Sequence, residues 1–270
     1  MKFFGTDGIR DAVNGPLMED AFLSRLGYAL GLWFHRAMAT PAQPIRVVFG
    51  RDTRASGPRI QKAIAEGLAQ SGASIELHDC GVVPTPALAS AVMRLGAPLG
   101  IMLTASHNSA TDNGVKLFKA GGLKWPDDEE RAFEGFLEAT LLPEPAHSVQ
   151  PTVMDEPARE AYVGAIQAIG SGRMLAGKKI ILDTANGATY ETSAEVLRAL
   201  GAELICIGDH PDGNNINAGC GSEYPAKLCE AVLDERADIG IAHDGDGDRL
   251  VVCDEQGGVL PGEVVMGALA

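Results

Sequence analysis

Short apolar runs and helical repeats alternate along the chain. Large apolar residues recur at three- or four-residue spacing between Phe22 and Phe34, which predicts an amphipathic helix. The β-branched run at 45–50 predicts a buried strand, followed by a helix near 58–71 and a second strand at 74–81. Strands that alternate with helices in this way predict an α/β fold with mixed, mostly parallel sheets.

The same pattern occurs twice. Residues 45–104 and 178–244 both run in the order strand, helix, Gly-Ala, strand, Pro-Ala helix, Gly-Ile strand. We interpret the repeat as an internal duplication that builds two tandem three-layer αβα domains. The proline-rich stretch 141–157 predicts a linker between them. The expected boundaries are a first domain at 1–150, a second at 151–254 and the start of a third at 255–270.

Each repeat ends in a polar, glycine-rich loop. The first Gly-Ile strand is followed by TASHNSATDNG, and the second is followed by HDGDGDR. Ligands of open α/β sheets collect outside the carboxyl ends of the strands. The simplest geometry therefore has these two loops facing one cleft.

The second loop places Asp244, Asp246 and Asp248 at alternate positions with glycines between them. Three carboxylates in a compact loop suit Mg²⁺ or Ca²⁺, and they repel one another unless a cation neutralises them. A solvated acidic turn is the plainer alternative. An EF-hand is disfavoured, because Arg249 stands where that loop needs Gly and the flanking segments resemble strands.

The first loop places Ser106 beside His107, and Lys116 follows ten residues after Ser106. No G-x-S-x-G segment surrounds the serine, which disfavours a hydrolase triad. A serine that carries and passes on a phosphoryl group needs a divalent cation, a nearby Arg or Lys and an acid/base. The aspartates, Arg249 and Lys116 supply these groups if the two loops meet.

Two further turns are bracketed by glycine. Arg10 is an isolated cation in the N-terminal FGTDGIR turn and could reach an anionic site. In the GRDTRASG turn, the favoured interpretation is structural, with Asp52 forming salt bridges to Arg51 and Arg54.

Composition narrows the classes of function. The formal charge of the 270 residues is −14 and the isoelectric point is about 4.8, which disfavours broad electrostatic capture of nucleic acid. No apolar run approaches the roughly 18 residues of a membrane span, and the start lacks a secretory leader. The five cysteines form no C-x-x-C pair, so a reducing, cytoplasmic compartment is expected.

Five motifs in order resemble the α-D-phosphohexomutases: FGTDGIR, GRDTRASG, TASHN with DNG and Lys116, DGNNIN with CGS, and DGDGDR. The segment at 212–225 is most similar to the phosphoglucosamine mutase branch. The resemblance implies interconversion of glucosamine 6-phosphate and glucosamine 1-phosphate through a phosphoserine enzyme. Glucosamine 1,6-bisphosphate would be the intermediate and activator, and one Mg²⁺ would be bound in each active site.

The resemblance also implies roles for single residues. Ser106 matches the phosphoserine, and its phosphate would complete a Mg²⁺ shell whose protein ligands are Asp244, Asp246 and Asp248. Lys116 matches the proposed general acid/base. Arg10 and Arg249 match cations near the phosphoryl group. His107 matches a histidine that orients or contacts phosphate.

The chain departs from the family pattern in two loops and in length. Ser109 replaces a usual Pro and Asp11 a usual Gly, and neither change removes a reacting group. The family has four domains, whereas this sequence ends near the start of the third. The sugar-recognition loop and phosphate clamp of domains III and IV have no match, so we expect a truncated, inactive half. A homodimer is also possible on this interpretation.

Two alternatives stay open at this point. One is another mutase of the same superfamily, acting on phosphomannose or phosphoglucose. The other is a catalytically incomplete half that binds Mg²⁺ without turnover. A phosphatase with an aspartate nucleophile is disfavoured, because the acidic loop has no D-x-D-x-T run.

Overall fold

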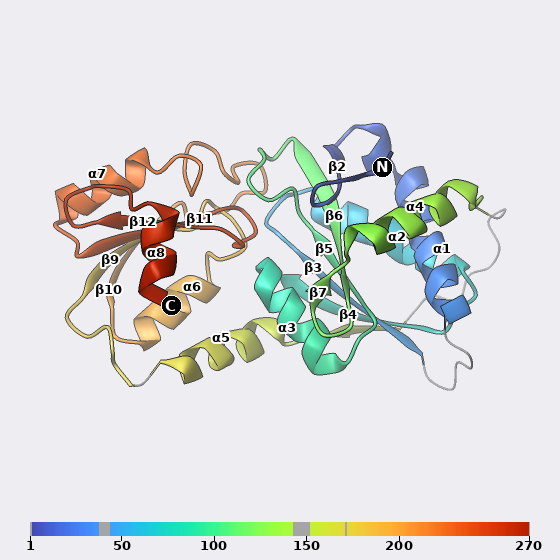
Figure 1. Cartoon of the computed structure of the whole chain (residues 1–270), viewed down its shortest axis with the longest axis horizontal. Coiled ribbons are helices and arrows are strands. Elements are labelled where there is room, and N and C mark those ends of the chain that lie inside the picture. Colours follow the sequence, from blue (N-terminus) through green and yellow to red (C-terminus); the bar gives the residue numbers. More distant parts are fainter. Residues whose placement is uncertain (1, 38–43, 143–151, 171, 270) are drawn as a thin grey trace.

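The computed structural model describes residues 2–37, 44–142, 152–170 and 172–269. Two α/β domains lie side by side along the long axis, the first on the right of Figure 1 and the second on the left. In the first, the strands are β1 (Phe4–Gly5), β2 (Gly8–Ala12), β3 (Ile45–Arg51), β4 (Ile75–Val82), β5 (Leu99–Leu103), β6 (Asp112–Lys119), β7 (Leu123–Lys124) and β8 (Thr152–Asp155). The helices packed around them are η1 (Pro16–Met18), α1 (Asp20–Ala37), α2 (Gly57–Gln70), α3 (Thr85–Leu95), α4 (Asp127–Ala139) and α5 (Ala158–Ile169). The second domain contains β9 (Lys179–Asp183), α6 (Thr192–Ala199), β10 (Glu203–Ile207), α7 (Ala226–Glu235), β11 (Ile239–His243) and β12 (Leu250–Asp254), and it is followed by α8 (Gly262–Leu269).

The first sheet has eight strands in the order β1-β2-β6-β5-β3-β4-β8, with β7 paired to β6. The pairs β5–β3, β3–β4 and β4–β8 are parallel, and the pairs that involve β1, β2, β6 and β7 are antiparallel. The helix and strands predicted between Phe22 and 81 are therefore confirmed as α1, β3, α2 and β4.

Helices cover both faces of this sheet. Val47 and Phe49 pack with α1, α2 and α4, whereas Val48 between them packs with α3 and α5 on the opposite face. This is the period-two alternation of a strand buried on both sides. Helices α1 and α2 approach so closely that a Cβ on Gly27 would lie 2.0 Å from the Ile64 carbonyl oxygen, so only glycine fits there.

The second sheet repeats the topology of the first. Its order is β10-β9-β11-β12, in which β9 pairs parallel to both neighbours and β12 is antiparallel. The corresponding strands of the first sheet, β4-β3-β5-β6, have the same order, directions and intervening helices. Figure 1 shows α6 and α7 on opposite faces. The predicted fold class, two αβα units related by duplication, is confirmed.

The described part of the connection between the domains forms a strand and a helix. Most of the predicted linker, residues 143–151, lies outside the described residues. The part that follows is a strand, because β8 pairs in parallel with β4 at the edge of the first sheet. Helix α5 then packs against α3 of the first domain and α6 of the second.

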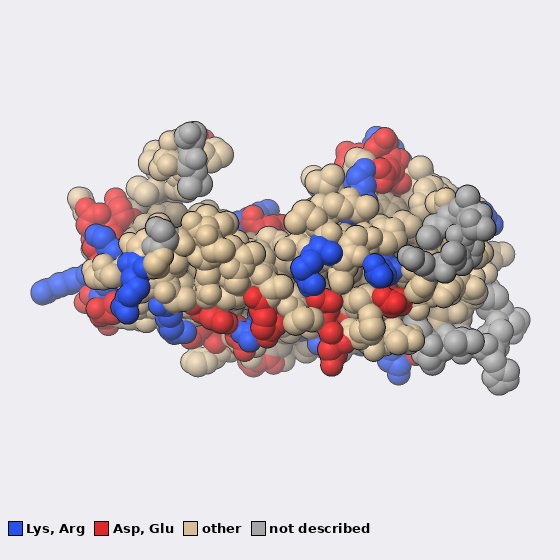
Figure 2. Space-filling view, turned by 90° about the horizontal axis from the view of Figure 1, so that it is seen from below, with Lys and Arg blue, Asp and Glu red and all other residues tan. Residues whose placement is uncertain are grey.

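The surface carries interspersed charges of both signs on the face shown in Figure 2. That view also shows α8 standing away from the body, with the surface hollowed between it and the first domain. No helix in the described part of the chain has the length and hydrophobicity needed to cross a bilayer.

Candidate active site

The predicted serine loop follows β5 and contacts the second domain. Ser106 is 2% exposed and has a left-handed backbone, with φ of 51°. Its hydroxyl donates a hydrogen bond to Asp244 Oδ2 at 2.7 Å. A left-handed conformation is unfavourable for a residue with a Cβ, so the surrounding contacts must hold it. The two loops singled out in the sequence therefore do meet, and they meet at the serine hydroxyl.

Three carboxylates converge in the loop after β11. One oxygen from each of Asp244, Asp246 and Asp248 lies within 4.8 Å of the others, and the first two residues are fully buried. Burial, followed by the charge of Asp246, raises the pKa of Asp244 to about 7. Among the described residues Asp246 Oδ1 has no hydrogen-bond partner although it is buried.

These observations fit a divalent cation. A buried oxygen without a partner costs stability unless a group outside the protein satisfies it. The donors are all hard carboxylate oxygens, which favour Mg²⁺ or Ca²⁺ over soft metals. The triad could thus bind a metal ion, with Asp246 Oδ1 free to act as a ligand.

Lys116 lies at the centre of this charge cluster. It projects from β6, is 2% exposed, and its Nζ is 2.8 Å from Asp246 Oδ2 and 2.9 Å from Asp248 Oδ2. A third carboxylate, Asp7 in the turn between β1 and β2, is 2.8 Å away. Burial lowers the pKa of Lys116, but the aspartates, led by Asp246, outweigh it and raise the pKa above its ordinary value. Lys116 is therefore an ammonium in this arrangement.

Arg54 of the first domain holds the serine loop through hydrogen bonds to its backbone carbonyl groups. The Arg54 side chain is fully buried and donates to the carbonyl oxygens of Ser106 at 3.0 Å, Asn108 at 2.8 Å and Asp112 at 2.9 Å, as well as that of Ser109. The predicted salt bridge to Asp52 is present, with Nε 2.9 Å from the carboxylate. The Arg54 guanidinium thus pairs with the buried Asp52 carboxylate and donates hydrogen bonds to four carbonyl groups of the loop.

Asn217 holds the same loop from the second domain. Its side-chain amide donates to the carbonyls of Ser106 and Asn108, both at 2.9 Å. Other contacts join the domains nearby, because Thr85 Oγ1 donates to Asp246 Oδ2 at 2.6 Å and Thr53 Oγ1 to the Asn186 carbonyl at 2.6 Å. The site is built from both domains.

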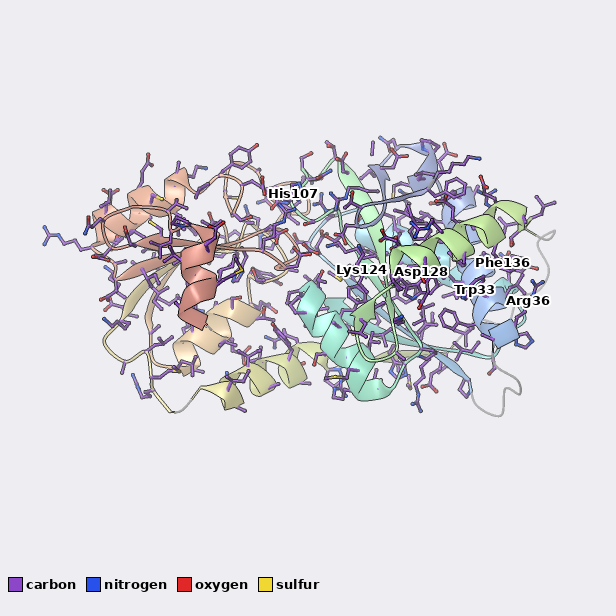
Figure 3. The ribbon with its side chains drawn as sticks, in the orientation of Figure 1. Trp33, Arg36, His107, Lys124, Asp128 and Phe136 are labelled. Atoms are coloured by element: carbon purple, nitrogen blue, oxygen red, sulfur yellow. The ribbon has the colours of Figure 1, made fainter. Side chains whose placement is uncertain are left out.

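The guanidinium groups of the remaining predicted cations pair with other residues, although the backbone N–H of Arg249 donates to Asp244 Oδ1 at 3.2 Å. Arg10 donates to Asn108 Oδ1 at 3.2 Å, and the Arg249 guanidinium pairs with Glu223 at 2.8 Å. Figure 3 places His107 where the two domains meet. Burial first, and then the positive charges of Arg249 and Arg10, lower the pKa of His107. His107 is therefore neutral at pH 7 and lies within the field of both arginines.

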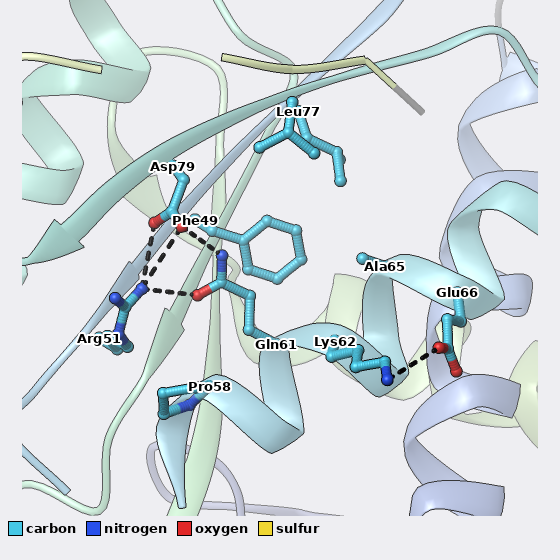
Figure 4. A pocket seen from close by; sticks show the side chains of 10 residues that line it. Phe49, Arg51, Pro58, Gln61, Lys62, Ala65, Glu66, Leu77 and Asp79 are labelled. Atoms are coloured by element: carbon cyan, nitrogen blue, oxygen red, sulfur yellow. Dashed lines mark hydrogen bonds and ion pairs between the residues drawn. The ribbon is translucent and has the colours of Figure 1, made fainter. Parts of the chain in front are cut away.

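Arg51 belongs to a different part of the first domain. It lines a cavity of about 380 Å³ next to α2 together with Phe49, Gln61 and Asp79. Figure 4 shows its guanidinium joined to Asp79 and Gln61, at 3.2 and 2.9 Å. Arg51 Nη1, Gln61 and Asp79 thus bond one another within the cavity. Arg51 does not pair with Asp52, contrary to the sequence-based expectation, because Asp79 on the neighbouring strand is in reach.

Three residues of the site were not assigned from the sequence. Asp7 lies in the FGTDGIR motif, from which only Arg10 was selected, and Thr85 carries no motif at all. Asn217 lies in the DGNNIN segment, whose sequence indicates a branch of the family but no contact with the serine loop. The motifs gave a signal for Asp7 and Asn217, but their contacts depend on how the two domains pack.

Comparison with known proteins identifies the family. Residues 1–142 match phosphoglucomutase/phosphomannomutase alpha/beta/alpha domain I, and residues 160–258 match domain II. The chain belongs to this family. The phosphoglucosamine mutase of Parvibaculum lavamentivorans is 42% identical over 272 residues, and that of Symbiobacterium thermophilum is 42% identical over 277. Each match covers 100% of this chain and 59% of the relative, so the chain spans about three-fifths of their length.

Solved structures agree with this assignment. A putative phosphomannomutase from Thermus thermophilus superposes with a TM-score of 0.82 at 28% identity, covering 98% of this chain and 60% of that one. A phosphoglucomutase/phosphomannomutase family protein from Burkholderia thailandensis gives a TM-score of 0.78 at 26% identity, covering 95% and 55%. The predicted membership of the phosphohexomutase superfamily is confirmed.

Proposed function

We propose that this chain is the phosphoserine- and metal-binding part of a phosphoglucosamine mutase. The complete enzyme would interconvert glucosamine 6-phosphate and glucosamine 1-phosphate through glucosamine 1,6-bisphosphate. The observation that carries the proposal is the 2.7 Å hydrogen bond from Ser106 to Asp244, which joins the serine loop of one domain to the acidic loop of the other. The identities of about 42% with phosphoglucosamine mutases support this choice of sugar over phosphomannose or phosphoglucose.

A phosphate on Ser106 would need a cation beside it. The phosphate would be carried by the Ser106 hydroxyl oxygen, which now lies 2.7 Å from the Asp244 carboxylate. Asp246 and Asp248 add two further carboxylates in the acidic loop. Like charges at such a distance repel strongly in a buried site. Asp244, Asp246 and Asp248 would hold Mg²⁺ together with the serine phosphate. When bound, the ion would offset negative charge on the phosphoryl group during transfer.

The protein residues supply position, charge and a proton. Arg54 and Asn217 fix the loop carbonyls, so the Ser106 oxygen is held beside Asp244 of the second domain. Arg10 and Arg249 would contribute positive charge toward the phosphoryl group, and neutral His107 would donate a hydrogen bond to phosphate. Because Lys116 is protonated, it is suited to give a proton to the sugar oxygen from which a phosphoryl group departs.

Further parts of the proposal concern the protein beyond this sequence. Domains III and IV would supply the sugar-recognition loop and the phosphate clamp, and we expect the 270-residue chain alone to be inactive. A cytoplasmic location fits the five cysteines, which are free thiols in the structure. A homodimer stays a prediction. A catalytically incomplete Mg²⁺-binding half is the alternative from another class of function.

Mass spectrometry separates these alternatives. The chain is purified, incubated with glucosamine 1,6-bisphosphate and Mg²⁺, and digested to locate any added phosphoryl group. We expect one on Ser106, and we expect its removal when glucosamine 6-phosphate is added to an enzyme that also carries the missing domains. Ser106→Ala should abolish both labelling and turnover, while Ser109→Ala in the same loop should retain labelling. Full turnover in the Ser106→Ala enzyme would refute the phosphoserine.

A further inference from the structure

Lys116 and a metal ion would compete for the same carboxylates. The lysine ammonium is within 2.9 Å of Asp246 Oδ2 and Asp248 Oδ2, which are two of the three residues that could ligate a cation. A divalent cation on the other oxygens of these carboxylates, such as the unpartnered Asp246 Oδ1, would repel the ammonium and neutralise the charge that now holds it. Binding of the metal therefore weakens the hold of the acidic loop on a lysine that is almost completely buried, and another counterion would offset that loss.

Asp7 is placed to be that counterion. Three carboxylates lie within ion-pair distance of Lys116 Nζ in the described structure, and Asp7 is the one outside the acidic loop. Its other oxygen, Oδ1, is 3.1 Å from Lys124 Nζ, which also bonds the Thr6 carbonyl at 2.9 Å and so fixes the turn (Lys124 is labelled in Figure 3). Burial raises the pKa of Asp7, but bonds to Lys116 and Lys124 outweigh it and hold the pKa below its usual value. Asp7 is therefore an anion at neutral pH.

We propose that Asp7 is a positioning residue that holds the Lys116 ammonium when a divalent cation takes Asp246 and Asp248. The lysine thereby stays beside the site instead of being expelled from it. Asp7 would raise metal affinity without ligating the metal, because it lowers the cost of separating Lys116 from the acidic loop. The inference rests on the cation site of the proposed function and adds a role for a residue that binds neither metal nor phosphate.

Direct metal titration of the 270-residue chain tests this role without any measurement of turnover. Mn²⁺ binding is followed by electron paramagnetic resonance, and Mg²⁺ is measured by competition. Asp7→Asn should weaken Mn²⁺ binding about tenfold, a typical coupling between groups in one charge network. Asp7→Glu should restore most of the affinity. Asp20→Asn, which removes the same charge at an exposed ion pair with Arg59, should leave it within about twofold.

A double-mutant cycle separates anchoring of the lysine from simple attraction between Asp7 and the metal. Lys116→Met removes the competing ammonium and should tighten Mn²⁺ binding. With Met at position 116, Asp7→Asn should change the affinity by less than about threefold, because there is no longer an ammonium to hold.

The outcomes are distinct. Equal affinities of Asp7→Asn and Asp20→Asn would overturn the role of Asp7 while leaving the metal site intact. An undiminished effect of Asp7→Asn after Lys116→Met would overturn it in the same way. Absence of Mn²⁺ and Mg²⁺ binding by the unaltered chain would overturn the metal site of the proposed function, and the inference with it. The comparison of the Asp7 and Asp20 variants decides the case even if Lys116→Met does not fold.

Discussion

Replacing Arg54 by Met removes the cation that joins a buried carboxylate to the serine loop. The side chains of Arg54 and Asp52 are both 0% exposed, and the guanidinium is within 3.0 Å of the carbonyls of Ser106, Asn108 and Asp112. Met fills a similar volume but offers no donor. The change therefore leaves Asp52 as an unpaired buried charge and frees the loop carbonyls.

The magnitude follows from the buried pair. Removing one partner of such a pair costs roughly 3–5 kcal/mol, against a total stability of about 5–15 kcal/mol. With a urea slope of about 2 kcal/mol per molar, the midpoint of unfolding should fall by about 2 M. Burial already raises the pKa of Asp52 and Arg54 opposes that shift, so without Arg54 the carboxyl protonates more easily. The loss of stability should accordingly shrink as the pH is lowered.

Tryptophan fluorescence makes this assay specific to the domain in question. The sequence has two tryptophans, Trp33 in α1 and Trp125, and both pack in the core of the first domain. The matched control is Arg54→Met combined with Asp52→Asn, which leaves no buried charge and should recover at least about 1.5 kcal/mol. The serine loop of this double variant would still lack the hydrogen bonds from Arg54 to its carbonyls, so labelling of Ser106 should remain impaired. A midpoint unchanged by Arg54→Met, or no recovery in the double variant, would show that Arg54 does not offset the buried charge of Asp52.

Two other variants test local features. Glu130 is buried with neither carboxylate oxygen bonded in the described structure, and burial raises its pKa from 4.5 to about 6. Because the folded state holds this proton more tightly than the unfolded state, the free energy of unfolding falls as the pH rises from 4.5 to 6. Glu130→Gln should therefore raise the melting temperature at pH 7.5 but not at pH 4. An equal shift at both pH values would contradict this. At Gly247, between Asp246 and Asp248, φ is +70° and an added Cβ would lie 2.4 Å from Thr189 Cγ2. Gly247→Ala should therefore strain the acidic loop by about 1–2 kcal/mol or more and weaken Mn²⁺ binding at least about tenfold. The matched control is Gly135→Ala, in α4 with open space around it. It should stabilise the chain by about 0.5–1 kcal/mol and leave Mn²⁺ binding unchanged. Weakened binding in both variants would show a non-specific effect.

The hydrophobic pattern was sufficient to predict most of the fold. Strands buried on both faces, such as β3 and β9, have continuous apolar runs, and the helices between them have an apolar stripe. Strand β8 was not predicted, because all four of its residues are exposed and it lies in a proline-rich stretch. Its position depends on pairing with β4, which no local pattern reports.

The site could be predicted only in part. Ser106 and Asp244 were found because glycine-rich polar loops follow equivalent strands, and the topology brings such loops together. Asp7, Arg54 and Asn217 act through contacts to groups distant in sequence, namely an ammonium and loop carbonyls. Arg54 was correctly expected to pair with Asp52, but backbone carbonyls have no sequence signature, so its hold on the serine loop could not be foreseen.

The proposed function requires that Ser106 and the three aspartates of the second domain share one cation. A crystal structure of the phosphorylated chain with Mn²⁺, with the metal located by its anomalous signal, tests it most directly. We predict a single strong peak bonded to Asp244, Asp246 and Asp248 and to one oxygen of the phosphate on Ser106, with metal–oxygen distances of about 2.0–2.2 Å. A metal bound elsewhere, or bound to the aspartates while the phosphate points away from it, would contradict the account.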